Sequence, residues 1–484
     1  MSRSLVIGPF NRIEGDLEVR LELSDGQVAA ARVTAPLYRG FERILTGRPA
    51  LDALVIAPRI CGICSVAQSS AAARALGEAM DLVPPANGRA AADIILACEN
   101  AADHLTHFYL FFMADFARQD YCGRPWHEEA ARRYKAMAGE AAKAASAARV
   151  RFLHIMGILA GKWPHSLALQ PGGITKSVDM GERMRLLAIL AEFRRFLEER
   201  TFGDSLERIA ALDGPKALEA WAAEKPPTAG DLRLFLDIAA DLGLGRWGRG
   251  PARFLSFGGF GPADRPLFAG GLWQDGRPDV LDLGALREDL GHTWMDGDPL
   301  HPADGRTEPK TDKAEAYSWC KAPRIAGRTV EVGALARQMV AGHPLARGLV
   351  AASDGRGNIR DRVVARLLEL AILVPAMERW VGLLGVDGAF CDTADMPRQA
   401  KGVGLVEAAR GSLGHWLSVD GGRIGGYQII APTTWNFSPR DSAGNPGPLE
   451  EALVGAPVAP GQDQPLIVQH IVRSFDPCMS CTVH

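Results

Sequence analysis

The sequence predicts a mainly α-helical fold with small antiparallel β elements and a core of long helices. Five stretches indicate the helices, because they are rich in Ala, Leu, Glu and Arg and repeat apolar residues three and four positions apart. These stretches are residues 68–81, 89–118, 127–160, 178–211 and 358–384. The chain has 484 residues, of which 47% are hydrophobic and 23% are charged, so it can bury a large core.

Antiparallel strands are predicted near both ends of the chain. Residues 17–23 alternate apolar and charged side chains, residues 24–26 (Ser-Asp-Gly) supply a turn, and residues 28–33 can return as a second strand. A further β-like segment spans residues 426–432. Between these regions, residues 245–312 are dense in Gly, Pro and Asp, which indicates irregular loops with short strands.

Charge and hydropathy exclude two classes of partner. The chain carries 54 Lys and Arg against 57 Asp and Glu, which gives a net charge of −3. It therefore lacks the excess of basic residues that is typical of a nucleic-acid binder. No apolar run approaches the roughly 18 residues of a membrane span, and the N-terminus lacks the apolar stretch of a secretory signal. We therefore expect no nucleic-acid partner, no membrane span and a cytoplasmic location.

Eight cysteines divide into two kinds. Four are isolated and are expected to be small buried apolar residues: Cys98, Cys122, Cys320 and Cys391. The other four form two pairs of the pattern Cys-x-x-Cys, Cys61 with Cys64 and Cys478 with Cys481. Four thiolates are the number that a closed soft-metal site needs.

The two pairs are 417 residues apart, much farther than in a zinc ribbon. Closing such a loop costs about 5 kcal/mol, whereas a thiolate metal site can return about 10–16 kcal/mol, so a shared site is thermodynamically possible. Spacing alone leaves a structural zinc site with four cysteine ligands open.

The neighbours of the pairs are more specific. Residues 59–64 read Arg-Ile-Cys-Gly-Ile-Cys and residues 476–484 read Asp-Pro-Cys-Met-Ser-Cys-Thr-Val-His. They resemble the two signature motifs of the large subunit of [NiFe] hydrogenases. Other family-like stretches lie before and between the two motifs, in the order that the family has them: Arg12–Gly15, Arg39–Glu42, Asp103–Tyr109, Glu407–Gly411 and Tyr427–Asp441. The resemblance covers residues 7–484 and excludes the related quinone-reducing subunit of respiratory complexes, which lacks the cysteine pairs.

The resemblance implies the [NiFe] hydrogenase large-subunit fold as a single domain over residues 1–484. Within it we expect five regions: residues 1–50 as a small β region, residues 51–244 and 313–415 as mainly helical, residues 245–312 as irregular, and residues 416–484 as the C-terminal metal-binding region.

The resemblance also implies the chemistry, which is the reaction H2 = 2 H+ + 2 e−. Nickel would be held by Cys61, Cys64, Cys478 and Cys481. Cys64 and Cys481 would bridge to an iron that also carries one CO and two cyanides. Sharing two soft sulfurs would keep the two metals close together.

Further residues around the nickel are carried over from the same resemblance. Arg410 would lie over the open coordination position, with Asp103 and Asp476 as its carboxylate partners. Either Arg410 or Cys478 could accept the proton, and the sequence does not choose between them.

Two further groups of residues match family positions. Glu14 matches a glutamate that relays protons outward, although without the motif it would be read as a solvent-facing carboxylate beside Arg12. Glu42, the backbone carbonyl of Ile429 and the terminal His484 match ligands of a nearby Mg²⁺. The two remaining histidines of that region are expected to form hydrogen bonds in the core or toward the site: His104 and His107.

The chain holds no spare cysteine cluster for iron–sulfur centres, so electrons must leave to clusters on another polypeptide. In the family this partner is an iron–sulfur small subunit. A heterodimer, or a dimer of heterodimers, is therefore implied by resemblance.

Four departures from the family pattern narrow the subtype. Gln68 replaces a usual histidine and would form a hydrogen bond near the bridging sulfur of Cys64, Asp16 replaces another histidine, and Ala409 replaces the proline before the arginine. The chain also stops at His484, where catalytic relatives are made with a C-terminal extension that is later removed.

Ile63 and Phe111 fall where the gas channel of the family narrows. They would favour H2 over O2 and give oxygen tolerance, unless they merely fill core space. The combination of departures resembles the H2-sensing regulatory hydrogenases, which turn over slowly and report to a histidine kinase. The alternative is an energy-conserving uptake hydrogenase in its mature form.

Overall fold

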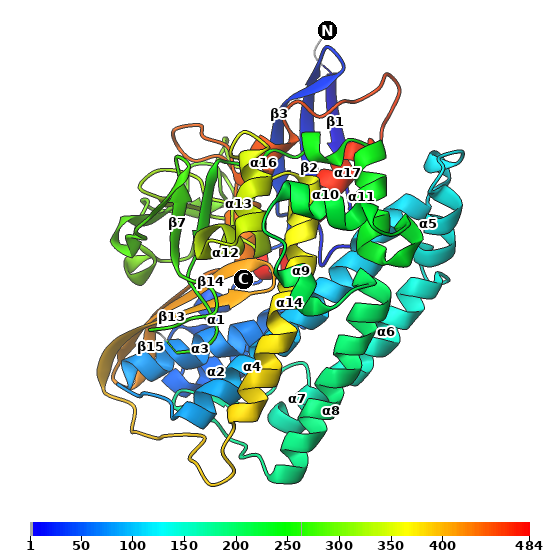
Figure 1. Ribbon diagram of the computed structural model, residues 1–484. Coiled ribbons are helices and arrows are strands. Elements are labelled where there is room, and N and C mark those ends of the chain that lie inside the picture. Colours follow the sequence, from blue (N-terminus) through cyan, green and yellow to red (C-terminus); the bar gives the residue numbers. More distant parts are fainter. Residues whose placement is uncertain (1–2, 263) are drawn as a thin grey trace.

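A three-stranded antiparallel sheet forms the N-terminal part of the chain in the computed structural model, which describes residues 3–262 and 264–484 (Figure 1). Its strands are β1 (Arg3–Ile7), β2 (Glu18–Ser24) and β3 (Gln27–Thr34), in the order β1-β2-β3. Alternate residues of β2 are buried, which confirms the hairpin predicted from the alternating pattern.

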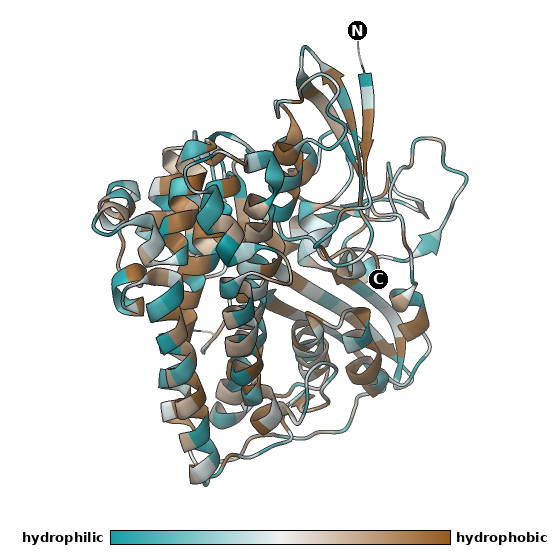
Figure 2. Ribbon diagram, turned by 90° about the vertical axis from the view of Figure 1, so that its right-hand side faces the viewer, coloured by the Kyte–Doolittle hydropathy of each residue, from teal (hydrophilic) through white to brown (hydrophobic). Residues whose placement is uncertain are grey.

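Four long helices lie side by side and form the core of the molecule (Figure 1). They are α4 (Ala86–Thr106), α6 (Glu140–Phe152), α8 (Met180–Phe196) and α14 (Ile359–Leu383). The long helices visible in Figure 2 carry both hydrophilic and hydrophobic residues, as expected for helices that bury one face. The predicted helical core is therefore confirmed.

The structure differs from the predicted helices in where they end and where they are interrupted. The stretch 127–160 divides into α5 (His127–Tyr134), α6 and α7 (His154–Ala160). The stretch 89–118 continues beyond α4 as a wide π-helical turn over His107–Phe112. Amphipathic periodicity reveals a helix better than its interruptions, because a turn of a few residues hardly changes the pattern.

A second three-stranded antiparallel sheet lies against helix α3 (Ser65–Ala79). Its strands are β13 (Gln399–Ala408), β14 (Gly411–Asp420) and β15 (Arg423–Ile430). Strand β13 lies inside the region 313–415, which we expected to be mainly helical, so that expectation was wrong for this segment. Gly404 shows how closely the helix approaches, because a Cβ there would lie 1.9 Å from the carbonyl oxygen of Ala71.

Short strands and loops make up the Gly- and Pro-rich region, as the composition predicts. The strands there are β6 (Arg253–Ser256), β7 (Gly271–Gln274), β8 (Arg277–Asp279), β9 (Leu286–Asp289), β10 (Met295–Asp296) and β11 (Glu308–Pro309). Strand β12 (Ala322–Ile325) pairs with β9.

The remaining elements connect these layers. They are α1 (Phe41–Leu45), α2 (Ala53–Ile56), β4 (Leu169–Gln170), β5 (Gly173–Ile174), α9 (Leu206–Ala210), α10 (Pro215–Ala223), α11 (Asp231–Asp241), α12 (Ala334–Ala341), α13 (Pro344–Ala351), α15 (Pro432–Asn436), α16 (Pro448–Leu453), α17 (Leu466–Ser474) and α18 (Met479–Thr482). None of the helices in the described ranges combines the length and the apolar character that crossing a bilayer requires.

The C-terminus lies in the middle of the molecule, whereas the N-terminus lies at its tip (Figure 1). Helix α17 packs on α14, and α18 packs on α15, so the last residues return to the centre of the fold. The terminal His484 is buried. This return brings the second cysteine pair to the first.

Candidate metal centre

Four cysteine sulfurs meet at the point where the N-terminal and C-terminal segments converge. The Sγ atoms of Cys61 and Cys478 lie 3.4 Å apart, and those of Cys64 and Cys481 lie 2.6 Å apart. All four sulfurs lie within 4.8 Å of one another. The structure thus brings together the two pairs, as the family resemblance implied.

Local structure places each pair at the start of a helix. Cys61 and Cys64 both precede α3, whereas Cys478 precedes α18 and Cys481 lies within it. Contacts among the sulfurs affect their charge. Hydrogen bonding with Cys478 lowers the pKa of Cys61 well below the usual range of a thiol. The same kind of contact raises the pKa of Cys64 well above that range. Four thiolates this close together require bound cations to offset their charge. The donor set therefore fits a pair of soft transition metals.

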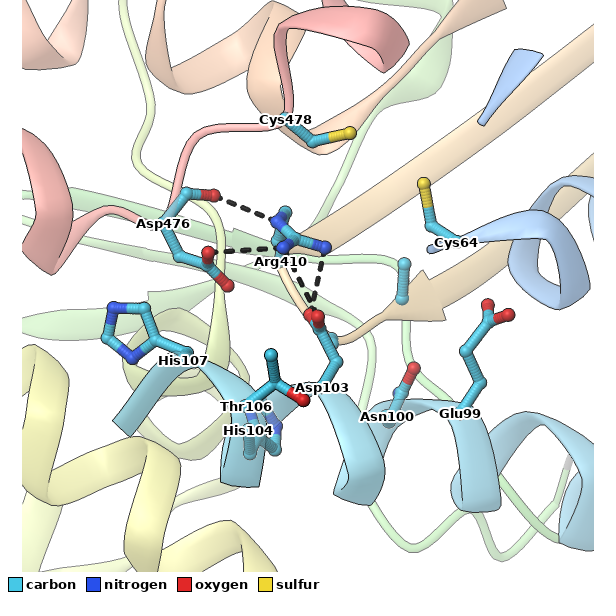
Figure 3. A network of polar contacts seen from close by, with 12 residues as sticks. Cys64, Glu99, Asn100, Asp103, His104, Thr106, His107, Arg410, Asp476 and Cys478 are labelled. Carbon is cyan, nitrogen blue, oxygen red and sulfur yellow. Dashed lines mark hydrogen bonds and ion pairs between the residues drawn. The ribbon is translucent and has the colours of Figure 1, made fainter. Parts of the chain in front are cut away.

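Arg410 faces the cavity beside the sulfurs and is held by two carboxylates (Figure 3). Its Nη1 lies 2.8 Å from Oδ2 of Asp103, and its Nη2 lies 3.1 Å from Oδ1 of Asp476. Its Nε donates to the backbone oxygen of Asp476 at 2.9 Å. All three side chains are buried, so the guanidinium is fixed in one orientation.

The two carboxylates differ in their environments. Burial raises the pKa of Asp103 to about 6. Burial also disfavours the charged form of Asp476, but Arg410 and Arg366 together lower its pKa. Asp476 has a positive φ of 58°, an uncommon backbone conformation for a residue with a side chain. Its two ion pairs therefore hold the chain in a strained turn immediately before Cys478.

A buried network behind Asp476 was not predicted from the sequence. Arg366 lies 3.1 Å from Asp476, and His104 connects Arg366 with Glu369. Glu369 in turn accepts two hydrogen bonds from Arg337. The residues come from three helices, α4, α12 and α14, so no local motif could have revealed them.

One face of α4 and of the π-helical turn that follows it contacts three parts of the site, the start of α3, Arg410 and α17 (Figure 3). Glu99 accepts hydrogen bonds from the backbone N–H groups of Val66 and Ala67, each at 2.9 Å, at the start of α3. One turn later, Asp103 holds Arg410. His107 contacts the backbone oxygen of Arg473 at 2.7 Å on α17.

His104 on α4 and His107 in the turn that follows it behave as expected, with hydrogen bonds inside the core. Glu99 was missed, although a carboxylate four residues before Asp103, on the same face of a predicted helix, is a usable signal.

Glu14 lies beside Cys478 through its backbone rather than through its side chain. Its N–H donates to the oxygen of Pro477 at 3.4 Å, and its own oxygen accepts from the N–H of Met479 at 2.7 Å. The next residue, Gly15, has a φ of +81°, and a Cβ there would lie 3.1 Å from Cβ of Met479. Glycine thus allows the close approach, and burial raises the pKa of the half-buried Glu14 carboxyl.

Gln68 contacts a different cysteine from the one expected. Its Nε2 lies 3.8 Å from Sγ of Cys481, not against Cys64. Its Oε1 lies 2.7 Å from Nε2 of His415. The hydrogen bond expected near the bridging sulfur of Cys64 is directed at the adjacent sulfur of Cys481, which lies 2.6 Å from that of Cys64. The other end of the Gln68 side chain is held by His415 on β14.

The two expected channel residues lie in different surroundings. Ile63 lines the cavity next to Cys64, together with Ala409 and Arg410. Phe111 is not among the residues that line this cavity, and its backbone oxygen accepts a hydrogen bond from Arg12.

A second cluster of oxygen and nitrogen atoms surrounds the C-terminal residue. His484 Nε2 lies 2.7 Å from the backbone oxygen of Ile429 and 3.3 Å from Oε1 of Glu42. Oε1 of Glu288, which lines the same small cavity, is buried without a hydrogen-bond partner within the described ranges. Hard oxygen ligands and an orphaned carboxylate oxygen fit a divalent cation such as Mg²⁺.

The fold and the buried sulfur cluster together define a protein with a thiolate-bound transition-metal centre. The chain belongs to the nickel-dependent hydrogenase family, whose sequence profile matches residues 39–120 and 238–484.

Similar proteins cover almost the whole chain. The large subunit of the periplasmic [NiFeSe] hydrogenase from Desulfomicrobium baculatum is 30% identical, over 99% of this chain and 94% of its own. The uptake hydrogenase large subunit of Azotobacter chroococcum is 28% identical, over 100% of this chain and 95% of its own. The structure of the reduced Ni-Fe-Se hydrogenase from D. vulgaris Hildenborough superposes with a TM-score of 0.84 at 28% identity, over 100% of both chains.

The chain is therefore the large subunit of a hydrogenase, an enzyme with a Ni–Fe centre, and such subunits pair with a small subunit. This membership removes the structural zinc site as an explanation of the four cysteines.

Proposed function

We propose that Cys61, Cys64, Cys478 and Cys481 hold nickel, and that Cys64 and Cys481 also hold an iron that carries one CO and two cyanides. The close approach of the Cys64 and Cys481 sulfurs, at 2.6 Å, supports this choice of bridging pair. When bound, the metals supply Lewis acidity for heterolytic cleavage of H2 and a route for its electrons.

The protein's own residues orient the substrate side of the site. Arg410 presents a fixed positive charge to the cavity, because Asp103 and Asp476 hold three of its hydrogen-bond donors. Its own pKa is raised far above the usual value, since both carboxylates offset the cost of burial, so it remains a hydrogen-bond donor. This favours Cys478, whose sulfur lines the same cavity, as the group that accepts the proton.

The proton then passes to Glu14. Its backbone pairs with that of Cys478. Its half-buried carboxyl lies between the buried centre and the surface, and its raised pKa suits a group that must take up and release a proton near neutral pH.

We also assign Mg²⁺ to Glu42, the Ile429 carbonyl and His484. There it would tie the C-terminus to the interior, next to Cys481. The electrons pass to iron–sulfur clusters on the small subunit, as a heterodimer or a dimer of heterodimers, because the remaining cysteines of the chain are scattered.

The observation that carries this function is the meeting of four sulfurs from the two ends of the chain. Metal analysis and infrared spectroscopy of the purified complex under H2 test it. Nickel and iron with CO and cyanide bands are expected. Zinc without such bands would overturn the assignment.

For the biological role, we propose H2 sensing with slow turnover and signalling to a histidine kinase. The support is Gln68 against Cys481 and Ile63 in the cavity, two residues that the family resemblance associates with the regulatory subtype. Deleting the gene should abolish H2-dependent expression of other hydrogenases without loss of bulk H2 uptake.

Energy-conserving uptake is the second candidate role, favoured by the names of the similar proteins, which include uptake and periplasmic hydrogenases. Under this role, deletion of the gene would remove most H2 uptake. The cellular location of the large subunit would then be set by the small subunit with which it pairs. The cytoplasmic location that we propose belongs to the sensor role, and fractionation of cells tests it.

A further inference from the structure

A line of buried side chains leads from the second sheet to one of the sulfurs. The hydroxyl of Tyr427 on β15 lies 2.7 Å from Nδ1 of His415 on β14. Nε2 of His415 lies 2.7 Å from Oε1 of Gln68 on α3, and Nε2 of Gln68 lies 3.8 Å from Sγ of Cys481. All four side chains are at most 2% exposed.

The chemistry of this line allows only two directions of hydrogen bonding. The imidazole of His415 is buried between two neutral partners, so it carries one proton and can donate from one nitrogen only. In the first direction Tyr427 donates to Nδ1, Nε2–H donates to the Gln68 oxygen, and the Gln68 amide nitrogen faces Cys481. In the second direction all donors reverse, and the Gln68 oxygen faces Cys481.

Two physical reasons select the first direction. In the second, the hydroxyl hydrogen of Tyr427 would have no acceptor, because His415 is its one hydrogen-bond partner within the described ranges. The second direction would also place a carbonyl oxygen against a sulfur that carries negative charge as a metal ligand, which is repulsive.

We propose that Tyr427 and His415 are positioning residues that fix the orientation of the Gln68 amide, so that its N–H points at the sulfur of Cys481. This inference rests on the proposed function, in which Cys481 bridges the two metals. Outer residues that orient a group next to a metal ligand commonly tune the metal. Here the group next to the sulfur is a neutral amide, and its direction is set from two residues away, by a tyrosine whose hydroxyl is hydrogen-bonded to His415 and not to a cysteine.

The expected consequence is spectroscopic. An N–H directed at a bridging sulfur withdraws electron density from it, and hence from the iron, so the CO stretching band lies at higher wavenumber than without the hydrogen bond. Tyr427→Phe removes the donor to Nδ1 and frees the imidazole tautomer. The CO band should then move to lower wavenumber or split into two.

A double-mutant cycle tests the order of the line. Gln68→Leu removes the N–H directly and should move the CO band in the same direction as Tyr427→Phe. Adding Tyr427→Phe to Gln68→Leu should then cause no further shift. Tyr134→Phe is the matched control, because it also removes a buried tyrosine hydroxyl, one that donates to Asp231 on α11. It should leave the band in place.

The outcomes separate the inference from the proposed function. A wild-type complex without nickel and CO bands overturns the proposed function. Wild-type bands that do not change in Tyr427→Phe, or additive shifts in the double variant, overturn the inference alone. If Tyr427→Phe does not fold, ¹⁵N NMR of the histidine-labelled wild-type complex decides. A proton on Nε2 of His415 supports the inference, and a proton on Nδ1 overturns it.

Discussion

Glu99 and Asp103 lie one helical turn apart on α4 and hold opposite walls of the metal centre. Glu99 binds the start of α3, directly after Cys64, and Asp103 binds the guanidinium of Arg410 at 2.8 Å. Because residues i and i+4 share one face of a helix, a single rigid element sets the spacing between a metal-binding segment and the arginine that faces it.

Glu99→Ala should therefore destabilise the protein and lower its metal content. The substitution leaves the buried N–H groups of Val66 and Ala67 without their acceptor, at a cost of about 1–3 kcal/mol for each group. Thermal unfolding and nickel content per chain measure the two effects. Asp179→Ala is a suitable control, because it removes an exposed carboxylate cap at the start of helix α8. It should lower stability by about 1 kcal/mol without loss of nickel. Equal nickel loss in both variants would contradict the role of Glu99.

Arg410→Lys should greatly reduce H2 oxidation although the charge is kept. A lysine ammonium cannot reproduce the planar, multi-donor contacts to Asp103 and Asp476. Single-turnover H2 oxidation measures the loss, with metal content determined in parallel. Wild-type rates in this variant would show that charge alone matters.

Cys64→Ser should prevent assembly of the two-metal centre, because it removes one of the two proposed bridging sulfurs. Metal analysis and the CO and cyanide bands report the loss. The isolated Cys98, which is buried on α4 and donates to the backbone oxygen of Phe152, offers a matched control. Cys98→Ser should retain both metals, and an active, fully loaded Cys64→Ser variant would refute the bridging assignment.

Glu14→Gln should leave the metals in place but slow the exchange of H2 with D2O, by about 10²–10⁴-fold if Glu14 acts as the proton relay. Glutamine keeps the size and the backbone pairing but cannot exchange a proton. Isotope exchange followed by mass spectrometry measures the rate. Exchange at the wild-type rate would place the proton exit elsewhere.

Ile63→Val combined with Phe111→Leu should increase the rate of inactivation by O2, because both changes remove bulk from the proposed gas passage. Ile63 lines the cavity at the sulfurs and Phe111 does not, so Ile63→Val alone should produce most of the effect. Activity after timed exposure to O2 gives the rate. Unchanged tolerance in the double variant would show that these side chains only fill space.

The sequence alone was sufficient wherever the information is local. The Cys-x-x-Cys pairs, the residues around them, the hairpin at residues 17–33 and the long amphipathic helices could all be read from short windows, because each depends on spacing within a few turns. Strand β13 could not be read in this way. It is packed against α3 through Gly402 and Gly404, so two of its buried positions carry no side chain and the apolar alternation of a half-exposed strand is missing from the sequence.

Tertiary structure decided which side chains meet across distant segments. The sequence showed that Gln68 replaces a histidine, but only the packing of α3 on the sheet shows that it faces Cys481 and His415. In the same way, Asp476 was predicted beside Arg410, but the fold adds Arg366 as its second partner. The physical reason is that a motif specifies residue types along the chain, whereas the direction of a buried hydrogen bond depends on groups that folding brings from hundreds of residues away.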